Sequence, residues 1–337
     1  MEKHSEGWIY SGQASDRLWS KSAIGRPLDG SGLLLSGAEV IFCHEHRHIE
    51  FPHPDWMEQA VMENSGVIDE AAIIEALRVP GNKIVLKNNL EHLGIDASSD
   101  SWAARWSSDK HPRQEGPLSE IRWFHSSDEL KIEDLHVWAS EVSSKSRVAE
   151  VIVVDDETSV VTYRVNISSP RGDMGELDEA KIANIRNRQF KPLANGGVIV
   201  LDVNQWPEER VGIPHPNGRM LDSITSDLIY SERKEDFTMG ASILADLLSR
   251  GLHCRPGFKY GTRWRCYDKP LGQEHAPWLV VHPTEAPSDW EGACLASRLA
   301  SGVGKTWLHP LQNNGAWEYL SISRPPADSR WSNPNRR

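Results

Sequence analysis

The sequence lacks any apolar run close to the roughly 20 residues that a membrane-spanning helix requires. Its first ten residues, MEKHSEGWIY, also lack the apolar segment of a signal peptide, so we expect a cytoplasmic protein. Cysteine is scarce: the 337 residues contain four, with no CxxC pair (Cys43, Cys254, Cys266, Cys294). Such scattered cysteines indicate unpaired thiols in a reducing compartment.

An overall excess of basic charge is also absent. The net charge of −11 argues against nucleic-acid binding by the surface as a whole. The charge is unevenly distributed, however: residues 1–249 carry −16 and residues 250–337 carry +5. A basic region on an acidic chain can still bind phosphates, because salt screens distant charges. An ordinary solvated surface would also account for an excess of this size.

The stretch SGVGKTW, residues 301–307, resembles the end of a nucleotide-binding P-loop but departs from it in two ways. The pattern GxxxxGK[ST] requires a glycine where the chain has Leu299. A P-loop also follows a strand and opens a helix. Here Ser288–Glu291 reads as a capping box for a helix that ends near Ser301–Gly302, so Lys305 precedes a strand. We therefore expect no nucleotide site.

The segment His44–His48 matches the zinc-protease motif HExxH. That motif works only within a helix, where both histidines share one face and the glutamate acts as base. Pro52 and Pro54 follow closely, and no third ligand stands out. A charged helix end or loop is the better interpretation, and we predict no metal and no cofactor.

The chain repeats itself. Residues 120–167 align with 277–324 at an offset of 157 without a gap, and both read strand, polar loop, helix, strand, tight turn, strand. Upstream, each copy has a helix that leads through a glycine turn into a strand. The sequence therefore predicts an α+β fold of two tandem related repeats, each with an N-terminal helix/strand subdomain and a mixed-sheet, nuclease-like subdomain.

The repeat also predicts the domain boundaries. We expect an inactive structural repeat, a charged linker with a short helix, a catalytic repeat and a C-terminal tail (residues 1–168, 169–195, 196–330 and 331–337).

The two copies differ in reactive side chains. Lys305 aligns with Val148 and His275 aligns with Leu118, while no tyrosine lies between Asn88 and Trp138 to align with Tyr267. This asymmetry suits a duplication in which one half stayed catalytic and the other became a scaffold.

The stretch GFKYGTRWRCYDKPLGQEHAPWLVV, residues 257–281, resembles the catalytic half of the archaeal tRNA-splicing endonucleases. That family shows a K-[YF]-G-x-x-[FW]-x-x-Y strand, then H-[SA]-x-x-L-V, then a lysine at the end of a helix. The resemblance is specific over about residues 240–324 and only architectural over the first half. It implies a metal-independent enzyme that excises introns from precursor tRNA at bulge–helix–bulge elements, leaving 2′,3′-cyclic phosphate and 5′-hydroxyl ends.

By the same resemblance, Tyr267 rather than Tyr260 is the general base, His275 the general acid and Lys305 the transition-state stabiliser. The residue types suit these roles, because histidine donates protons near neutrality and lysine places a point charge beside phosphate. A phenol, with a pKa of about 10, is a weak base unless a neighbouring cation favours phenolate. Lys305 and Arg265 are both candidates for that cation. Whether Tyr267 acts as a base or orients the 2′-hydroxyl stays open.

Two further features follow from the resemblance. Arg298 and Arg324 match arginines that sandwich a flipped-out base of the RNA by stacking and cation–π contact. The turn Asp155-Asp156-Glu157 matches a loop of the inactive repeat that inserts into a positive pocket of the other subunit, which implies a homodimer. Solvated arginines and an ordinary polar turn are the alternatives.

Two alternative functions are compatible with parts of the sequence. A non-catalytic subunit of such an enzyme is disfavoured because Tyr267, His275 and Lys305 are all present. A P-loop nucleotide-binding protein is disfavoured by Leu299.

Overall fold

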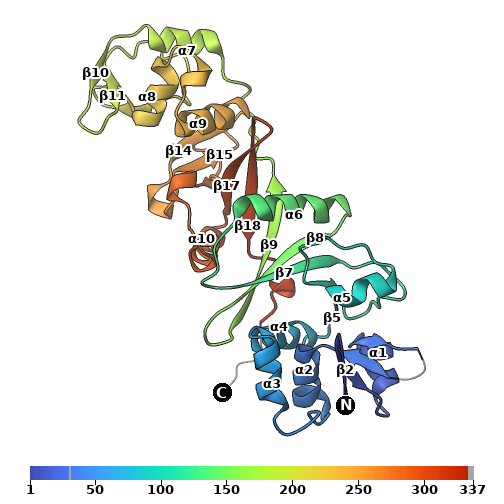
Figure 1. Cartoon of the computed structure of the whole chain (residues 1–337). Helices are drawn as coiled ribbons and strands as arrows, with labels where there is room; N and C mark the ends of the chain where they lie inside the picture. Colours follow the sequence, from blue (N-terminus) through green and yellow to red (C-terminus); the bar gives the residue numbers. More distant parts are fainter. Residues whose placement is uncertain (30–31, 333–337) are drawn as a thin grey trace. The chain divides into compact units, whose positions relative to one another are not determined.

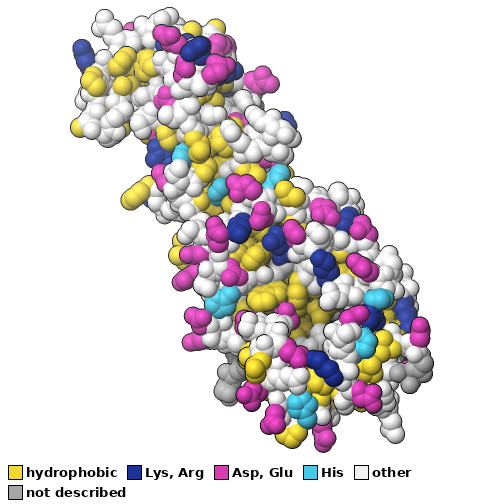
Figure 2. Space-filling model, in the orientation of Figure 1, with side chains coloured by type: hydrophobic (Ala, Val, Ile, Leu, Met, Phe, Trp, Pro, Cys, Tyr) yellow, Lys and Arg dark blue, Asp and Glu magenta, His cyan; other side chains and the backbone are white. Residues whose placement is uncertain are grey.

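The computed structural model describes residues 1–29 and 32–332, so the predicted tail 331–337 lies almost wholly outside the described residues (Figure 1). Contacts divide the chain into two units. The first comprises Met1–Asn166, Pro287–Leu295 and Ile322–Arg337, and the second Ile167–Ala286 and Ala296–Ser321. Acidic and basic side chains are interspersed over the face shown in Figure 2.

Within the described ranges, no helix combines the length and the apolar content needed to cross a bilayer.

The N-terminal part of the first unit contains a small antiparallel sheet with the strand order β1-β2-β4-β3, accompanied by four helices. The elements are β1 (Glu2–His4), β2 (Gly7–Tyr10), α1 (Ser15–Ser22), β3 (Arg26–Pro27), β4 (Leu33–Leu35), α2 (Gly37–Arg47), α3 (Trp56–Glu63) and α4 (Val67–Arg78). A capping box between Ser36 and Glu39 begins α2, because each side chain accepts a hydrogen bond from the other residue's backbone N–H.

The rest of the first unit contains five strands in the order β5-β6-β7-β8-β9. The elements are β5 (Lys83–Leu86), α5 (Lys87–Leu90), β6 (Ala103–Trp106), β7 (Ser119–His125), α6 (Ile132–Ser144), β8 (Val148–Val154) and β9 (Val160–Ser168). Strands β7 and β8 are parallel, and the other neighbouring pairs are antiparallel. Helix α6 is the crossover between the parallel strands and buries Leu135, Trp138 and Val142 on one face.

The second unit begins with a sheet in the order β10-β11-β13-β12 and three helices. The elements are α7 (Glu179–Arg186), β10 (Phe190–Pro192), β11 (Val198–Val200), β12 (Ile213–His215), β13 (Gly218–Leu221), α8 (Ser223–Tyr230) and α9 (Met239–Ser249). The segment predicted as a linker contains the expected short helix, α7. Ile182 and Ile185 of that helix are buried with Val198 and Val200, so this part of the segment is folded into the second unit.

The second unit continues with the strand order β14-β15-β16-β17-β18, in which β16 and β17 are parallel and the other pairs antiparallel. The elements are β14 (His253–Pro256), β15 (Trp264–Tyr267), β16 (Trp278–Val280), α10 (Trp290–Gly302), β17 (Thr306–Asn313) and β18 (Ala316–Ser323). Asn314 and Gly315 join β17 to β18 with φ values of 50° and 79°, as expected of a two-residue hairpin turn. The order and pairing of strands match those of the first unit, and the predicted α+β class is confirmed.

Residues 287–295 and 322–330, predicted as parts of the catalytic repeat, are counted with the first unit. Local contacts explain this grouping for the first segment. Leu130 donates its backbone N–H to the carbonyl of Ser288, and Phe124 stacks on Trp290 with ring centroids 4.7 Å apart.

The HExxH match falls at a helix end, as expected. Helix α2 ends at Arg47, and His48 has a φ of 56°, so His44 and His48 do not share a helical face. The His44 ring stacks on Phe51 and lies 3.0 Å, through Nδ1, from the carbonyl oxygen of Ile49.

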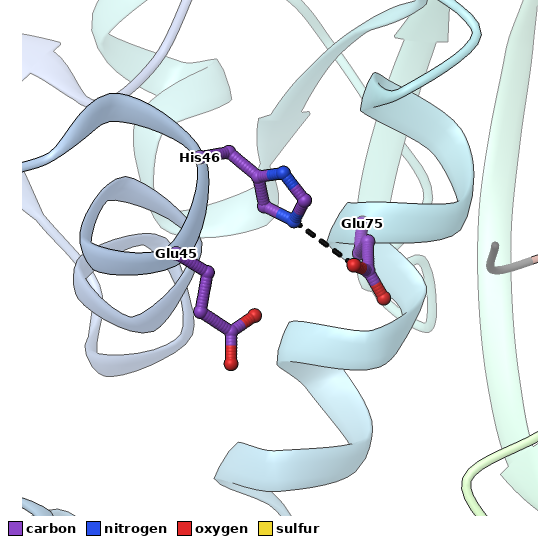
Figure 3. Close-up of side chains that lie close together, drawn as sticks. All are labelled: Glu45, His46 and Glu75. Atoms are coloured by element: carbon purple, nitrogen blue, oxygen red, sulfur yellow. Dashed lines mark hydrogen bonds and ion pairs between the residues drawn. The ribbon is translucent and has the colours of Figure 1, made fainter. Parts of the chain in front are cut away.

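A different group near this helix end brings together three potential metal-ligand side chains. Within the described ranges, the ligand atoms of Glu45, His46 and Glu75 lie within 4.8 Å of one another (Figure 3). The Nε2 atom of His46 lies 2.9 Å from Oε1 of Glu75. Because this contact already gives the buried Glu75 carboxylate a partner, the cluster reads as a hydrogen-bonded contact between α2 and α4.

Candidate active site

Three strand ends meet at one edge of the sheet in the second unit. Strand β15 ends at Tyr267, with Cys266 opposite Trp278 at the start of β16, and Trp278 is opposite Thr306 at the start of β17. Since β15 runs antiparallel to β16 while β16 and β17 are parallel, the end of β15 lies beside the starts of the other two strands. This topology brings Tyr267, the segment before β16 and Lys305 to the same edge.

Tyr267 and His275 line the same open cleft, which has a volume of about 920 Å³. Ile213 and Pro214 of β12 form one wall, and residues of β14 and β15 form another. Tyr267 is half-buried and His275 is exposed. In the described part of the chain, neither the Tyr267 hydroxyl nor the His275 ring has a hydrogen-bond partner, so both groups are available to a ligand.

Lys305 is held against the residue that follows His275 and is not among the residues that line the cleft. Its Nζ donates a hydrogen bond of 2.5 Å to the backbone carbonyl of Ala276, the next residue in the chain. The ammonium also lies 5.7 Å from the centre of the Tyr260 ring. Because an ammonium has three donors, at least one N–H remains for a ligand.

The end of α10 determines where Lys305 lies. The helix begins after Asp289, whose Oδ1 accepts the backbone N–H of Gly292, so the cap is Asp289 rather than Ser288. At its end, Gly304, not Gly302, adopts the left-handed conformation with a φ of 67°. Lys305 then donates its backbone N–H to the carbonyl of Ala300, and β17 begins at the next residue.

Of the two cations expected near Tyr267, Arg265 lies over its ring. Its guanidinium carbon lies 5.8 Å from the centre of the Tyr267 ring, whereas Lys305 contacts the ring of Tyr260. Arg255 lies directly opposite Arg265 and also lines the cleft. Sequence reasoning did not identify Arg255. Arg265 lies two residues before Tyr267, so the alternation along a strand puts both side chains on the same face of the sheet. The position of Arg255 beside them follows only from the pairing of β14 with β15.

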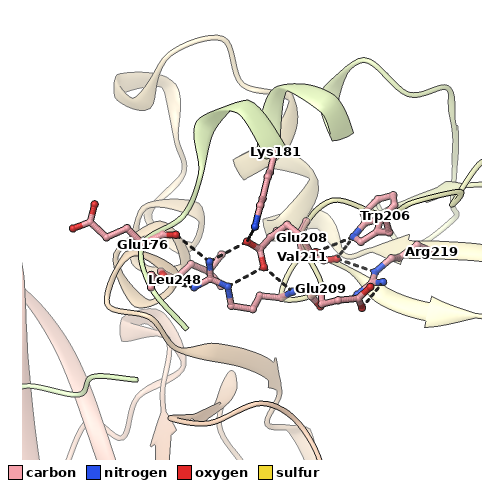
Figure 4. Close-up of polar contacts among 10 residues, drawn as sticks. Glu176, Lys181, Trp206, Glu208, Glu209, Val211, Arg219 and Leu248 are labelled. Carbon is pink, nitrogen blue, oxygen red and sulfur yellow. Dashed lines mark hydrogen bonds and ion pairs between the residues drawn. The ribbon is translucent and has the colours of Figure 1, made fainter. Parts of the chain in front are cut away.

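A buried network fixes the chain segment that leads to the cleft wall (Figure 4). Arg210 contacts the Glu208 carboxylate through Nε and Nη2, at 2.9 and 3.0 Å. Arg210 also donates to the carbonyl of Leu248, and Arg219 donates to that of Val211. These charge-assisted bonds hold residues 208–211 against the rest of the second unit.

The first unit lacks this set of groups at the corresponding edge. There β6 ends at Trp106, Leu118 precedes β7, and β8 begins at Val148. None of these three side chains can transfer a proton or carry a charge, which is consistent with a structural role for that unit.

His253 lies opposite Tyr267 in the β14–β15 ladder, with ring centroids 6.5 Å apart. Its side chain is buried, and burial, together with the charges of Arg255 and Arg210, lowers its pKa from 6.5 to about 3. The ring is therefore neutral in the folded protein over the physiological pH range.

Acid should destabilise the protein through His253. A histidine with a lowered pKa in the fold contributes stability that is complete above pH 6.5 and is lost as pH falls toward 3, because the unfolded chain takes up the proton first. Between pH 7 and 5 this residue should lower the free energy of unfolding by about 2 kcal/mol. Urea denaturation at both pH values should show a smaller pH dependence for His253→Leu. The exposed His215→Leu control should behave like the wild type, and an equal pH dependence in all three proteins would refute the assignment.

The two arginines predicted to bind a flipped base are both exposed. Arg298 lies on the part of α10 that belongs to the second unit, whereas Arg324 follows β18 and is counted with the first. Within the described ranges, neither side chain lies within 4 Å of a carboxylate. Their contact with a base stays a prediction.

The acidic turn joins β8 to β9. The Asp155 Oδ1 accepts the backbone N–H groups of Glu157 and Ser159, at 3.0 and 2.8 Å, so this residue holds the turn together. Asp156 and Glu157 are exposed. Asp156 Oδ1 lies 3.4 Å from Nε2 of His125, but its side chain is still 96% exposed, so the turn presents both carboxylates at the surface.

Comparison with known proteins identifies the region that supplies most of the cleft lining, all of it except Ile213 and Pro214. Residues 237–319 match the model of the tRNA intron endonuclease catalytic C-terminal domain. This range includes Tyr267, His275, Arg298 and Lys305.

Several curated proteins are similar to the chain. The tRNA-splicing endonuclease of Thermoplasma volcanium is 30% identical over 172 residues, 51% of this chain and 53% of that relative, so the match spans about half its length. The tRNA-splicing endonuclease of Methanopyrus kandleri is 31% identical over 139 residues, 40% of this chain and 77% of that relative. That of Methanococcoides burtonii is 22% identical over 93% of this chain and 95% of the relative. The chain therefore belongs to the tRNA-splicing endonuclease family.

Proposed function

We propose that the protein cleaves precursor tRNA at the intron boundaries of a bulge–helix–bulge element, with Tyr267, His275 and Lys305 as its catalytic residues. One observation carries the proposal: Tyr267 and His275 share one cleft, and Lys305, at the same edge of the sheet, is bonded to the carbonyl of Ala276, the residue after His275. All three belong to the segment that resembles the family's catalytic domain.

The RNA supplies its own nucleophile, the 2′-hydroxyl beside the scissile phosphate. Tyr267 takes the hydroxyl proton or orients the hydroxyl, and the 2′-oxygen forms a bond to phosphorus. The bond from phosphorus to the 5′-oxygen breaks, and His275 gives a proton to that oxygen. Lys305 stabilises the extra negative charge on the non-bridging oxygens. The products are a 2′,3′-cyclic phosphate and a 5′-hydroxyl, and no metal is needed to generate hydroxide.

The experiment is incubation of the purified protein with an intron-bearing precursor tRNA and with a matched RNA whose bulges are closed into a continuous helix. We expect two cuts in the first RNA and none in the second. Binding without cleavage of the first RNA would indicate a non-catalytic subunit instead.

The exposed Arg298 and Arg324 are proposed to hold a flipped base of each bulge.

We also propose a homodimer in which the acidic turn of one subunit meets a positive pocket of the other. The Asp156 and Glu157 side chains support this, because both are exposed on a turn that Asp155 holds in shape. Electrostatic complementarity of this kind determines which surfaces pair.

Reversing these two charges should weaken the dimer. For Asp156→Lys combined with Glu157→Lys, we expect the dimer dissociation constant to rise by about tenfold or more. Light scattering over a dilution series measures the effect, with Asp155 left intact so that the turn survives. The matched control reverses two exposed carboxylates of the second unit, Glu232 and Glu235. Equal masses for both double variants at every dilution would contradict the role of the turn.

A further inference from the structure

Two adjoining hollows in the first unit are lined by basic side chains. The larger has a volume of about 560 Å³, and its lining includes three cations from the helices α1 and α2 (Arg17, Lys21, Arg47). The smaller has a volume of about 310 Å³, and its lining includes Lys21 again and three further cations (Lys83, Lys110, Arg113). Because Lys21 lines both hollows, these six residues form one continuous region, here called the basic surface.

Few carboxylates offset this charge. In the described part of the chain none lines the larger hollow, and Asp109 alone lines the smaller one. Lys110 is paired with Glu115 at 2.5 Å. Four of the six side chains are exposed and form no ion pair within the described ranges (Arg17, Lys21, Arg47, Arg113). Residues 1–249 carry a net charge of −16, so a local excess of cations is an exception in this part of the chain.

The fold makes little use of the cations on α1. Arg17 and Lys21 are four residues apart on one face of the helix, where like charges are destabilising. Helix α1 joins β2 to β3, and residues 201–212 join the corresponding strands β11 and β12 of the second unit. The arginine of that connection, Arg210, is buried and paired with Glu208. The first unit instead presents the positive charge of its connection to solvent.

The basic surface has a rigid base. Helix α1 buries Trp19, and Nε2 of His111 lies 3.1 Å from the carbonyl oxygen of Trp19. The guanidinium carbon of Arg113 lies 5.5 Å from the centre of the Trp19 ring. These contacts hold α1 and the segment around His111 together, so the two hollows keep their relative position. A surface that is already in place loses less entropy when an extended ligand binds.

We propose that the basic surface binds the phosphate backbone of a helical part of the precursor RNA, outside the bulge–helix–bulge element. The proposal rests on the proposed function, because its ligand is the RNA substrate. Phosphate contacts of this kind add affinity without reading sequence. None of the six residues lines the cleft, so the RNA that they hold is a part other than the cut phosphates.

An acidic protein segment is the other anion to consider. The exposed carboxylates of the turn, Asp156 and Glu157, are adjacent in the chain. The cations of the basic surface extend over two hollows, which suits a polymer with a negative charge at every nucleotide better than a two-residue turn.

The test is the double variant Arg17→Gln with Lys21→Gln, studied by fluorescence anisotropy. The ligand is a labelled precursor tRNA with 2′-deoxy sugars at both cut positions, so that binding is measured without cleavage. We expect Kd to rise about five- to tenfold, as for the loss of two charged contacts of exposed side chains. The slope of log Kd against log salt concentration should fall by about 0.7 to 0.9 for each lost contact. A short RNA that consists of the bulge–helix–bulge element alone should bind and be cleaved as by the wild type.

The matched control is Lys3→Gln with Lys131→Gln. Both are exposed cations of the first unit, outside the two hollows, and each lies beside a carboxylate, at 2.5 Å from Glu63 and 3.7 Å from Glu129 respectively. This variant removes the same charge and should keep the wild-type Kd and salt slope. A thermal melt checks both double variants, and we expect little change because glutamine is nearly as good a helix former as arginine and lysine.

Other outcomes would overturn the site. An unchanged Kd for precursor tRNA, or an equal rise in the control, would show that no specific RNA contact is made there. An equal rise for the short RNA would show that the two cations act at the bulge–helix–bulge element. A variant that dissociates by light scattering while the wild type stays dimeric would show that the surface takes a partner's carboxylates. Cleavage by the wild type is scored separately, so failure of the site is distinct from failure of the proposed function.

Discussion

Tyr267→Phe should lower the single-turnover cleavage rate about 100- to 10,000-fold, the usual range for a group that transfers a proton in the transition state. The change removes one oxygen. That oxygen has no hydrogen-bond partner in the described part of the chain, so the fold loses no contact. The rate is measured on precursor tRNA with enzyme in excess, and a thermal melt followed by circular dichroism checks the fold.

Tyr260→Phe is the control for this prediction. Tyr260 is the other phenol in the same sequence motif, and its ring lies beside the Lys305 ammonium. Removing its hydroxyl leaves the ring in place, so cleavage should stay near the wild-type rate. If Tyr260→Phe lost activity while Tyr267→Phe kept it, the assignment of the two tyrosines would be wrong.

His275→Ala should lower the rate by a similar factor, because the departing 5′-oxygen then leaves without a proton. The loss should be specific to that oxygen. A substrate with sulfur in place of the bridging 5′-oxygen has a leaving group that needs no proton, so the variant should cleave it at nearly the wild-type rate. The same substrate should not rescue Tyr267→Phe. Failure of the sulfur substrate to rescue His275→Ala would remove this residue from the role of acid.

Much of the architecture around the cleft could be predicted from local patterns. The helical spacing from Trp290 onward, the Asn-Gly turn and the strand beginning after Lys305 each depend on neighbouring residues, and each occurs as expected. Helix termini were less well predicted, because the choice between Ser288 and Asp289 or between Gly302 and Gly304 depends on backbone angles that the sequence does not display.

The features that sequence reasoning missed depend on pairing between distant strands. The register that sets Arg255 opposite Arg265, and His253 opposite Tyr267, follows from how β14 meets β15. A shift of one residue would turn each of these side chains to the other face. The folding of part of the predicted linker also depends on distant contacts. Ile182 and Ile185 are isolated apolar residues in a charged segment, and their burial follows from packing against strand residues such as Val198 and Val200.

The central claim is that the RNA's own 2′-hydroxyl attacks the phosphorus while Tyr267, His275 and Lys305 act around it. The most direct measurement is cleavage of a precursor tRNA in excess chelator, with the chemical ends of the fragments determined and with a second RNA carrying a single 2′-deoxy sugar at one cut position. The account predicts 2′,3′-cyclic phosphate and 5′-hydroxyl ends, and no cut at the deoxy position while the other site is still cleaved. Cleavage at the deoxy position, or fragments with 5′-phosphate ends, would contradict it.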